Sequence, residues 1–238
     1  MTNLAAAILD PLLRTDPAGP RITYYDDSTG ERIELSAATL ANWAAKTANL
    51  LRDELGAGPG SRVAVLLPAH WQTAGVLFGI WYIGAEVVIG EPVSGNCDVA
   101  LCTADRIAEA DDTGAGEVVV LSLDPFGKPA GDLPFGVTDY ATSVRVHGDQ
   151  IVPERAPGPA LAGKSAAEVL AAAQSGAATK GFSAGTRLLS SAAWSTTDEL
   201  IANLLTVFAG GASLVQVANP DETKLARRRE TEKVTADL

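Results

Sequence analysis

The sequence has few of the residues that commonly hold metals or form disulfides. Its 238 residues include two cysteines, two histidines and one methionine. Two cysteines cannot form a disulfide framework or a four-ligand zinc site. Cys97 and Cys102 lie beside the apolar run 99–101, so we expect both thiols to be buried and inert. His70 and His147 have no second ligand residue at a suitable spacing, and we expect both to be surface residues.

Positive charge is also scarce. The chain has 18 Lys and Arg against 29 Asp and Glu, a net charge of −11, and its pI is near 4.6. Phosphate binding needs clustered cations, so this balance argues against nucleic acid or an anionic membrane as a partner. One basic triplet, Arg227–Arg229, is surrounded by acidic residues. We interpret it as a charged helix face and not as a phosphate site.

No hydrophobic run is long enough for a membrane span. The segment 76–90 comes nearest, but it contains Glu86 and several glycines. Residues 4–13 are apolar, yet Asp10 and Pro11 interrupt them and no basic stretch precedes them, unlike a secretory signal. We therefore expect a soluble, cytoplasmic protein that is not associated with a membrane.

Common catalytic and nucleotide-binding motifs are missing. The sequence contains no Gly-x-Ser-x-Gly elbow, no Gly-x-Gly-x-x-Gly after a strand and no Walker loop. The stretch Gly176-Ala-Ala-Thr-Lys-Gly181 follows a predicted helix and does not join a strand to a helix. Its backbone amides would therefore not point at a phosphate.

Apolar residues are abundant, at 47% of the chain, and their pattern alternates between strands and helices. Two β-rich runs, 21–25 and 31–35, surround a glycine turn and predict a hairpin. Ser36 is a plausible N-cap for a long helix to about Leu55, followed by a continuous apolar strand at 62–68. Further strands are predicted at 84–89, 99–102, 117–121, 186–190 and 210–217, and further helices at 4–13, 71–83, 104–110, 165–178 and 197–208. This order predicts an α/β fold, with a mostly parallel sheet and helices on both faces.

The predicted elements suggest one α/β domain over residues 1–220. Within it, about 124–163 is rich in Gly, Pro and Asp and is expected to be a long surface connection with one helix-like patch near 138–146. Residues 221–238 are charged and are expected to form a solvated tail or a terminal helix that frays.

Several segments together resemble a known enzyme family. Ile22-Thr-Tyr24, a long helix and Gly58-Pro-Gly-Ser-Arg-Val-Ala-Val-Leu-Leu-Pro68 resemble the opening of AMP-forming adenylating enzymes, which include acyl-CoA synthetases. The likeness continues through a helix at 74–83, Gly84-Ala85 and a strand at 87–92 that ends in Pro92. It returns at 165–178, Arg187-Leu-Leu-Ser-Ser and 204–217, and covers about 22–122 and 164–220. The resemblance implies the first half of that family's N-terminal domain.

The departures from the family bear on activity. The family's phosphate loop, which ends in Pro-Lys-Gly, should lie just before the helix at Ser165. This sequence instead has Ala156-Pro-Gly-Pro-Ala-Leu-Ala-Gly-Lys164, with no cluster of hydroxyls. Such a loop binds phosphates through amides and hydroxyls, so triphosphate affinity should be lost. The family's Tyr-Gly-x-Thr-Glu motif, its ribose-binding Asp and its catalytic Lys also have no counterpart, so no catalytic residue, cofactor or metal ligand can be transferred.

One position does correspond to the family's substrate pocket. Trp194 stands where the resemblance implies an aromatic residue of the acyl pocket, and a core tryptophan is the competing interpretation. The sequence favours a catalytically degenerate binding, scaffold or regulatory module, with a small-molecule ligand near Trp194 and a protein partner or homo-oligomer. Two alternatives stay open: ligase activity completed by a partner chain, and an unrelated small-molecule enzyme on the same fold.

Overall fold

The computed structural model describes residues 1–90, 93 and 95–238. Its strands form two five-stranded sheets, with the orders β10-β8-β9-β1-β2 in sheet A and β4-β3-β5-β6-β7 in sheet B. In sheet A only the β1–β2 pair is antiparallel, and in sheet B every described pair is parallel. The strands are β1 (Pro20–Asp26), β2 (Glu31–Ser36), β3 (Arg62–Leu66), β4 (Glu86–Val88), β5 (Val99–Cys102), β6 (Glu117–Val120), β7 (Val137–Asp139), β8 (Arg187–Ser190), β9 (Ser213–Ala218) and β10 (Ala236–Asp237).

Local sequence signals explain where the main helices begin and end. The Ser36 hydroxyl accepts a hydrogen bond from the Thr39 amide and caps α2, as the sequence predicted. Ser165 and Glu168 form a capping box at the start of α6, which ends at Gly181 with a φ of 69°. The helices are α1 (Leu4–Thr15), α2 (Ala37–Asn49, continued as a π-helical turn at Leu50–Glu54), α3 (Trp71–Tyr82), α4 (Ile107–Asp112), α5 (Tyr140–Ser143), α6 (Ala166–Lys180), α7 (Thr197–Leu200, continued as a π-helical turn at Ile201–Leu205), α8 (Thr206–Ala209) and α9 (Glu222–Thr231).

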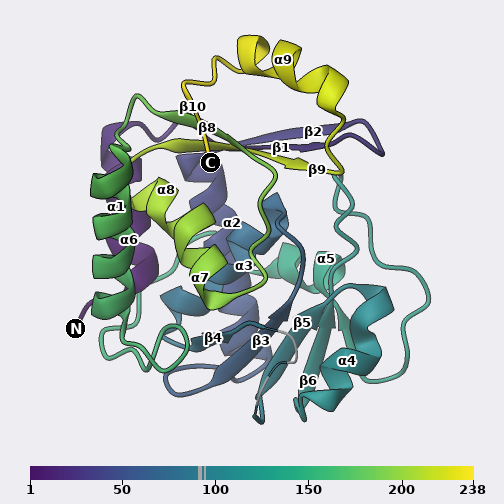
Figure 1. The fold of residues 1–238 in the computed structure, drawn as a ribbon. Helices are drawn as coiled ribbons and strands as arrows, with labels where there is room; N and C mark the ends of the chain where they lie inside the picture. Colours follow the sequence, from purple (N-terminus) through teal and green to yellow (C-terminus); the bar gives the residue numbers. More distant parts are fainter. Residues whose placement is uncertain (91–92, 94) are drawn as a thin grey trace.

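A layer of helices lies between the two sheets (Figure 1). Helix α3 is buried along its whole length, and α2 packs against it. Together with α1, α6 and α8 these helices share one core with Ile22 and Leu214 of sheet A and Val63 and Val119 of sheet B. The opposite face of sheet A is covered by α9, and α4 packs against the outer face of β5 and β6.

The predicted α/β class with mostly parallel strands is confirmed, with one refinement. The strands are divided between two sheets and do not form a single one. Hydrophobic periodicity shows which segments are strands but not which strands pair, because pairing is decided by contacts between distant segments. The helix-like patch expected near 138–146 is present as α5 and a 3-10 turn at Val144–Val146. The predicted strand end at Pro92 lies outside the described residues.

The C-terminal segment differs from a solvated, fraying tail. Helix α9 forms as predicted, but Arg228 is buried, and β10 pairs in parallel with β8. Leu225 and Val234 pack over Val215 and Val217, so this segment covers apolar surface of sheet A. A charged sequence therefore forms an ordered layer because its few apolar residues meet a hydrophobic sheet face.

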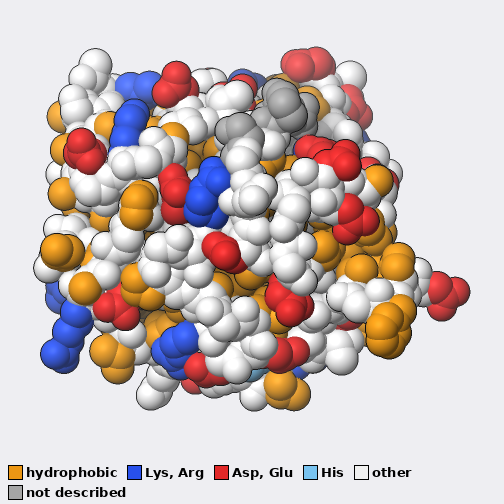
Figure 2. All heavy atoms as spheres, turned by 90° about the horizontal axis from the view of Figure 1, so that it is seen from below, with side chains coloured by type: hydrophobic (Ala, Val, Ile, Leu, Met, Phe, Trp, Pro, Cys, Tyr) orange, Lys and Arg blue, Asp and Glu red, His pale blue; other side chains and the backbone are white. Residues whose placement is uncertain are grey.

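The face opposite sheet A carries mixed side chains (Figure 2). Acidic residues are spread across it among hydrophobic and uncharged ones, and basic residues stand apart from one another. Among the described residues, no helix is both long enough and apolar enough to cross a membrane.

Candidate functional site

A cavity of about 860 Å³ opens where strands of both sheets end. It is lined by residues at or beyond the carboxyl ends of four strands: β1 and β9 of sheet A, and β3 and β6 of sheet B. The start of β2 completes the lining. The carboxyl ends of parallel strands are the usual ligand sites of α/β folds. The lining residues are Tyr24, Asp26, Thr29, Gly30, Glu31, Arg32, Ile33, Pro68, His70, Ser122, Leu123, Asp124, Pro125, Phe126, Ala218 and Asn219.

His70 lies in the wall of this cavity and caps α3. Its Nδ1 accepts a hydrogen bond from the Gln72 amide at 3.1 Å, which assigns the ring proton to Nε2. The side chain is only 2% exposed, and Nε2 has no hydrogen-bond partner among the described residues. Burial lowers the pKa of His70, and the nearby Glu31 carboxylate opposes this effect only in part. His70 is therefore a neutral ring with an unused N–H donor, and the expectation of a surface histidine is wrong for this residue.

Glu31 lies beside His70 at the start of β2. Its Oε1 is 3.9 Å from His70 Nε2, too far for a hydrogen bond, and accepts one from Trp71 Nε1 at 3.4 Å. The side chain is 9% exposed, and no Lys or Arg of the described residues pairs with it. The recorded partners of this nearly buried carboxylate within the described chain, the Trp71 indole and the His70 ring, are thus both neutral.

Two further carboxylates lie at the cavity. Asp26 Oδ1 accepts hydrogen bonds from Ser28 and from Asn219 Nδ2 at 3.0 Å. Burial raises the pKa of Asp26, but these hydrogen bonds outweigh it and the net pKa is lowered, so the group is ionised at neutral pH. Asp124 Oδ1 accepts the amides of Phe126 and Lys128.

The backbone is strained where two chain segments leave their sheets at this cavity. Leu123, beyond β6, has a φ of 56°, and Asn219, beyond β9, has a φ of 47°. Residues other than glycine rarely adopt this left-handed conformation, and such strain concentrates at functional sites. Phe126, which follows Leu123, is 81% exposed at the cavity.

The structure places the sequence-predicted candidates elsewhere. Trp194 is buried in the main core with 1% exposure, its Nε1 has no hydrogen-bond partner among the described residues, and it does not line the 860 Å³ cavity. His147 lies near the surface and interacts with Glu54 through Nε2 at 3.0 Å. Cys97 and Cys102 are buried and free, as predicted, and burial raises the pKa of Cys102 to about 11.

The arginine triplet is also accounted for. Arg228 points into the protein and pairs with Asp27, and Arg229 pairs with Asp237. Only Arg227 has no recorded partner within the described chain. Two of the three arginines of this α9 segment are thus used in ion pairs within the protein. The triplet therefore offers no cluster of free cations to a phosphate.

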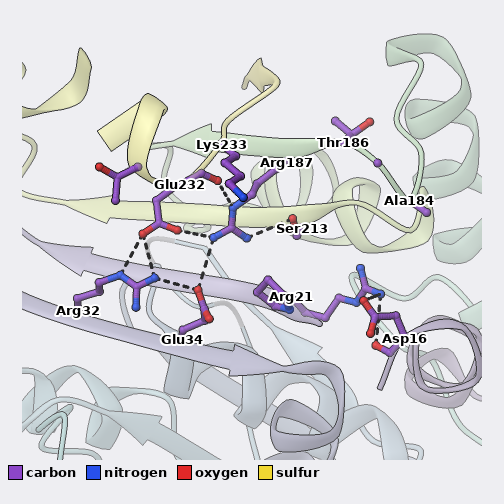
Figure 3. A pocket seen from close by; sticks show the side chains of 13 residues that line it. Asp16, Arg21, Arg32, Glu34, Ala184, Thr186, Arg187, Ser213, Glu232 and Lys233 are labelled. Atoms are coloured by element: carbon purple, nitrogen blue, oxygen red, sulfur yellow. Dashed lines mark hydrogen bonds and ion pairs between the residues drawn. The ribbon is translucent and has the colours of Figure 1, made fainter. Parts of the chain in front are cut away.

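A second cavity, of about 470 Å³, lies at the other end of sheet A (Figure 3). Glu232 lines this cavity and connects several side chains. Its carboxylate pairs with Arg187 at 2.5 Å and with Arg32 at 2.9 Å, and it accepts a hydrogen bond from the Tyr25 hydroxyl at 2.5 Å. Burial raises the pKa of Glu232, but the bonds from Tyr25, Arg187 and Arg32 lower it overall. These charges satisfy one another, so the network fastens the end of α9 to β1, β2 and β8.

Metal binding finds no support in the described residues. No group of three or more His, Cys, Asp and Glu side chains among them could hold an ion. What the first cavity offers is a buried neutral donor without a partner in the described chain, His70 Nε2, beside several acceptor carboxylates.

Comparison with known proteins agrees with this fold. The pattern of the AMP-binding enzyme family matches residues 14–114. A TIGR03089 family protein from Mycobacterium tuberculosis is 66% identical over 242 residues, covering 100% of this chain and 98% of that protein. The chain belongs to the TIGR03089 family.

Solved structures similar to this TIGR03089 family member include a bacterial acyl-CoA synthetase, an acetoacetyl-CoA synthetase and an N-terminal domain of FACL13. A Brucella canis acyl-CoA synthetase has a TM-score of 0.81 at 16% identity, over 99% of this chain and 47% of that protein. Acetoacetyl-CoA synthetase from Streptomyces lividans has a TM-score of 0.77 at 19% identity, over 99% and 42%. The N-terminal domain of FACL13 from Mycobacterium tuberculosis has a TM-score of 0.70 at 20% identity, over 100% and 62%. The chain thus spans about half the length of the first two enzymes, and the likeness shows the fold.

In this TIGR03089 family member, the segment before α6, residues 158–165, is hydrogen-bonded to the rest of the protein. The amides of Gly158, Ala160 and Gly163 donate to Gly84 O, Lys164 O and Glu86 Oε1. The amides of Leu161, Lys164 and Ser165 are likewise bonded within the chain. The Ala160 carbonyl accepts from Trp81 Nε1 and the Val87 amide, and Leu161 is fully buried.

Proposed function

We propose that this protein is a catalytically degenerate relative of AMP-forming adenylating enzymes that acts as a ligand-binding module. Its ligand site is the 860 Å³ cavity between the sheets, and it does not carry out adenylation. The observation that carries the proposal is the segment before α6, because the resemblance assigns that position to the phosphate loop.

A phosphate loop needs free backbone amides and hydroxyls that converge on the phosphate oxygens. Here six backbone amides already donate to acceptors of the protein itself: those of Gly158, Ala160, Leu161, Gly163, Lys164 and Ser165. The one hydroxyl at the end of the segment, Ser165, is used in the capping box of α6. Binding a triphosphate would require breaking these bonds and exposing Leu161, which supports the loss of nucleotide chemistry.

The cavity supports the part of the proposal that assigns ligand binding to this protein. It has the volume of a small-molecule site, and its wall combines apolar side chains with a few polar groups. An unpartnered donor at His70 and a nearly buried Glu31 carboxylate would both gain from a ligand. These are features of a binding site, and none of them is supplied by the segment before α6.

A protein partner or self-association is the second part of the proposal. Apart from Met1, the large hydrophobic side chains that are exposed among the described residues all lie in the connection 124–163: Phe126, Phe135, Val146 and Val152. Exposed apolar side chains on one segment are typical of an interaction surface. Light scattering at micromolar concentration should show an oligomer, and Phe135→Ser should weaken it; a monomer that captures no partner would contradict this part.

The adenylation half is tested by ATP–pyrophosphate exchange with a panel of carboxylic acids, with the protein alone and with cell lysate added. We expect no exchange and no thermal stabilisation by ATP, AMP, CoA or acyl-CoA. An active acyl-CoA synthetase serves as the positive control. Exchange by the protein alone would overturn the proposal, and exchange only with lysate would favour a ligase completed by a partner chain.

The binding half is tested by a thermal-shift screen of small molecules on the wild-type protein. Hits that accept a hydrogen bond from Nε2 should stabilise His70→Asn less than the wild-type protein, because this variant keeps a helix-capping side chain but removes the ring donor. Turnover of a hit, in place of simple binding, would favour the alternative of a small-molecule enzyme on this fold.

A further inference from the structure

We infer that the cavity between the sheets takes a small organic cation: a protonated amine on an apolar body, with an oxygen acceptor beside the nitrogen. This inference rests on the proposed function, because it assumes that the cavity is the ligand site. It adds the chemical class of the ligand, which neither the fold nor the family relationship supplies.

The charge of the lining favours a cation. Glu31, Asp26 and Asp124 are its acidic residues, and Arg32 is its only basic one within the described chain. Arg32 is already engaged, since Nε donates to Glu232 and Tyr25 and Nη2 to Glu34. An anionic ligand would therefore meet carboxylates with no free cation to balance it.

Glu31 is the residue that gains most from a cation. Its carboxylate is nearly buried, and its recorded partners are the neutral Trp71 indole at 3.4 Å and the His70 ring at 3.9 Å. Taking a carboxylate out of water without a cationic partner is costly. A ligand ammonium group would supply the missing charge and form a charge-assisted hydrogen bond.

His70 defines the second polar feature of the ligand. Its Nδ1 is fixed as the acceptor that caps α3, so Nε2 carries the proton and can only donate. Because Nε2 is buried and unpartnered 3.9 Å from Glu31, an oxygen that accepts from it would lie close to the group bound by Glu31. The pair therefore fits a nitrogen and an oxygen on neighbouring atoms of one ligand.

The rest of the wall suits an apolar body. Tyr24, Ile33, Pro68, Leu123 and Phe126 provide aromatic and aliphatic surface around the polar pair. The Tyr24 and His70 rings meet edge-on with their centres 4.3 Å apart, so an aromatic ring lies beside the His70 member of the polar pair. Aromatic rings attract cations, so this contact adds to the preference for an amine.

The class is tested with probes that share one aromatic body. 2-Phenylethylamine, 2-phenylethanol and 3-phenylpropionate differ in charge, and 2-amino-1-phenylethanol adds a hydroxyl beside the amine. Calorimetric titration of the full chain at pH 7 and low salt should show the amine binding at least about tenfold more tightly than the alcohol. The carboxylate should not bind, and the amino alcohol should bind more tightly than the simple amine.

Single-residue variants test which side chains cause the expected differences in affinity between the probes. Glu31→Gln should abolish the difference between amine and alcohol, whereas Glu34→Gln, on the same strand but outside the cavity, should preserve it. His70→Asn should remove only the added gain of the amino alcohol. In nuclear magnetic resonance spectra, the Trp71 indole signal, which reports the bond to Glu31, should shift with the amine, and that of Trp194 should not.

The outcomes separate the ligand class from the proposed function. Equal or tighter binding of the alcohol or carboxylate, with a shift of the Trp71 signal, would overturn the cationic class but leave the cavity as a binding site. Amine binding that leaves the Trp71 signal unchanged would also overturn it. If no probe binds and a broad compound screen stabilises nothing, the proposed function fails as well. Should Glu31→Gln not fold, the order of the probes on the wild-type protein and its weakening by salt decide the question.

Discussion

Arg228 on α9 and Asp27 in the β1–β2 hairpin form a two-pronged ion pair, with nitrogen–oxygen distances of 3.1 and 2.7 Å. Both side chains are 6% exposed, and the Arg228 guanidinium lies 4.1 Å from the centre of the Tyr25 ring. Paired planar groups of this kind are among the strongest ionic contacts in proteins. The pair fastens α9 to sheet A, and its titration makes that attachment dependent on pH.

Asp27→Asn should make the folded protein less stable at pH 7 by about 2 kcal/mol. The Arg228 hydrogen bonds lower the pKa of Asp27 to about 2, below its value in the unfolded chain. The stabilisation is therefore complete above the unfolded pKa, near 4, and is lost as the pH falls through about 2. Urea unfolding at pH 7, 4 and 2.5 should show the wild-type and variant stabilities converging at low pH. Asp237→Asn, in an exposed pair with Arg229, should change stability little; an equal loss there would contradict the prediction.

Glu232→Gln should loosen the C-terminal segment. The substitution leaves the nearly buried Arg187 facing a neutral group, at a cost of about 3 kcal/mol, whereas the loss at Arg32, which is 44% exposed, is screened by solvent. We expect faster amide hydrogen exchange in α9 and faster proteolytic cleavage near Asn219, measured by mass spectrometry. Glu230→Gln, an exposed change on the same helix, is the control. Equal protection of α9 in both variants would show that the network does not hold it.

Gly79→Ala should destabilise the contact between α2 and α3. A Cβ at this position would lie 2.8 Å from Thr47 Cβ and 3.0 Å from the Ala44 carbonyl oxygen. Overpacking of this kind costs about 1–3 kcal/mol, which exceeds the gain in helix propensity. Gly75→Ala on the same helix meets Trp43 only at 3.3 Å and should be close to neutral. Thermal melts compare the two, and equal melting temperatures would contradict the packing argument.

Cys97 and Cys102 should react slowly with a thiol reagent in the native protein. Burial raises the pKa of both thiols, for Cys102 to about 11, so at pH 8 about one Cys102 in a thousand is a thiolate. Colour development with a disulfide reagent should be complete only after urea is added. Rapid native reaction of either residue would show that its burial is incomplete in solution.

The sequence predicts the elements of this fold better than their arrangement. The apolar run 62–68 and the wholly buried helix α3 follow from hydrophobic pattern, and Ser36 from its capping chemistry. The division into two sheets depends on contacts between distant segments, such as β1 with β9, which no local pattern records. Arg228 shows the same limit, since its burial follows from a partner 201 residues away in the chain.

The candidate site was harder to predict for a related reason. Glu31, His70, Asp124 and Asn219 come from four separate stretches of the chain and share no motif spacing. A lone histidine usually lies at the surface, and His70 departs from this because its ring caps the buried helix α3. The signal that could have drawn attention to it is its position directly after a buried strand, where α/β folds place their ligands.

The helical layer shared by the two sheets has a thermodynamic consequence. Because Ile22 and Leu214 of sheet A and Val63 and Val119 of sheet B lie in one continuous core with α2 and α3, neither sheet can melt without uncovering the helices that also support the other. Cooperativity of this kind is expected to give a single unfolding transition, reported alike by circular dichroism and by tryptophan fluorescence. The geometry of the cavity rim would then be maintained by the same core that sets the global stability of the protein.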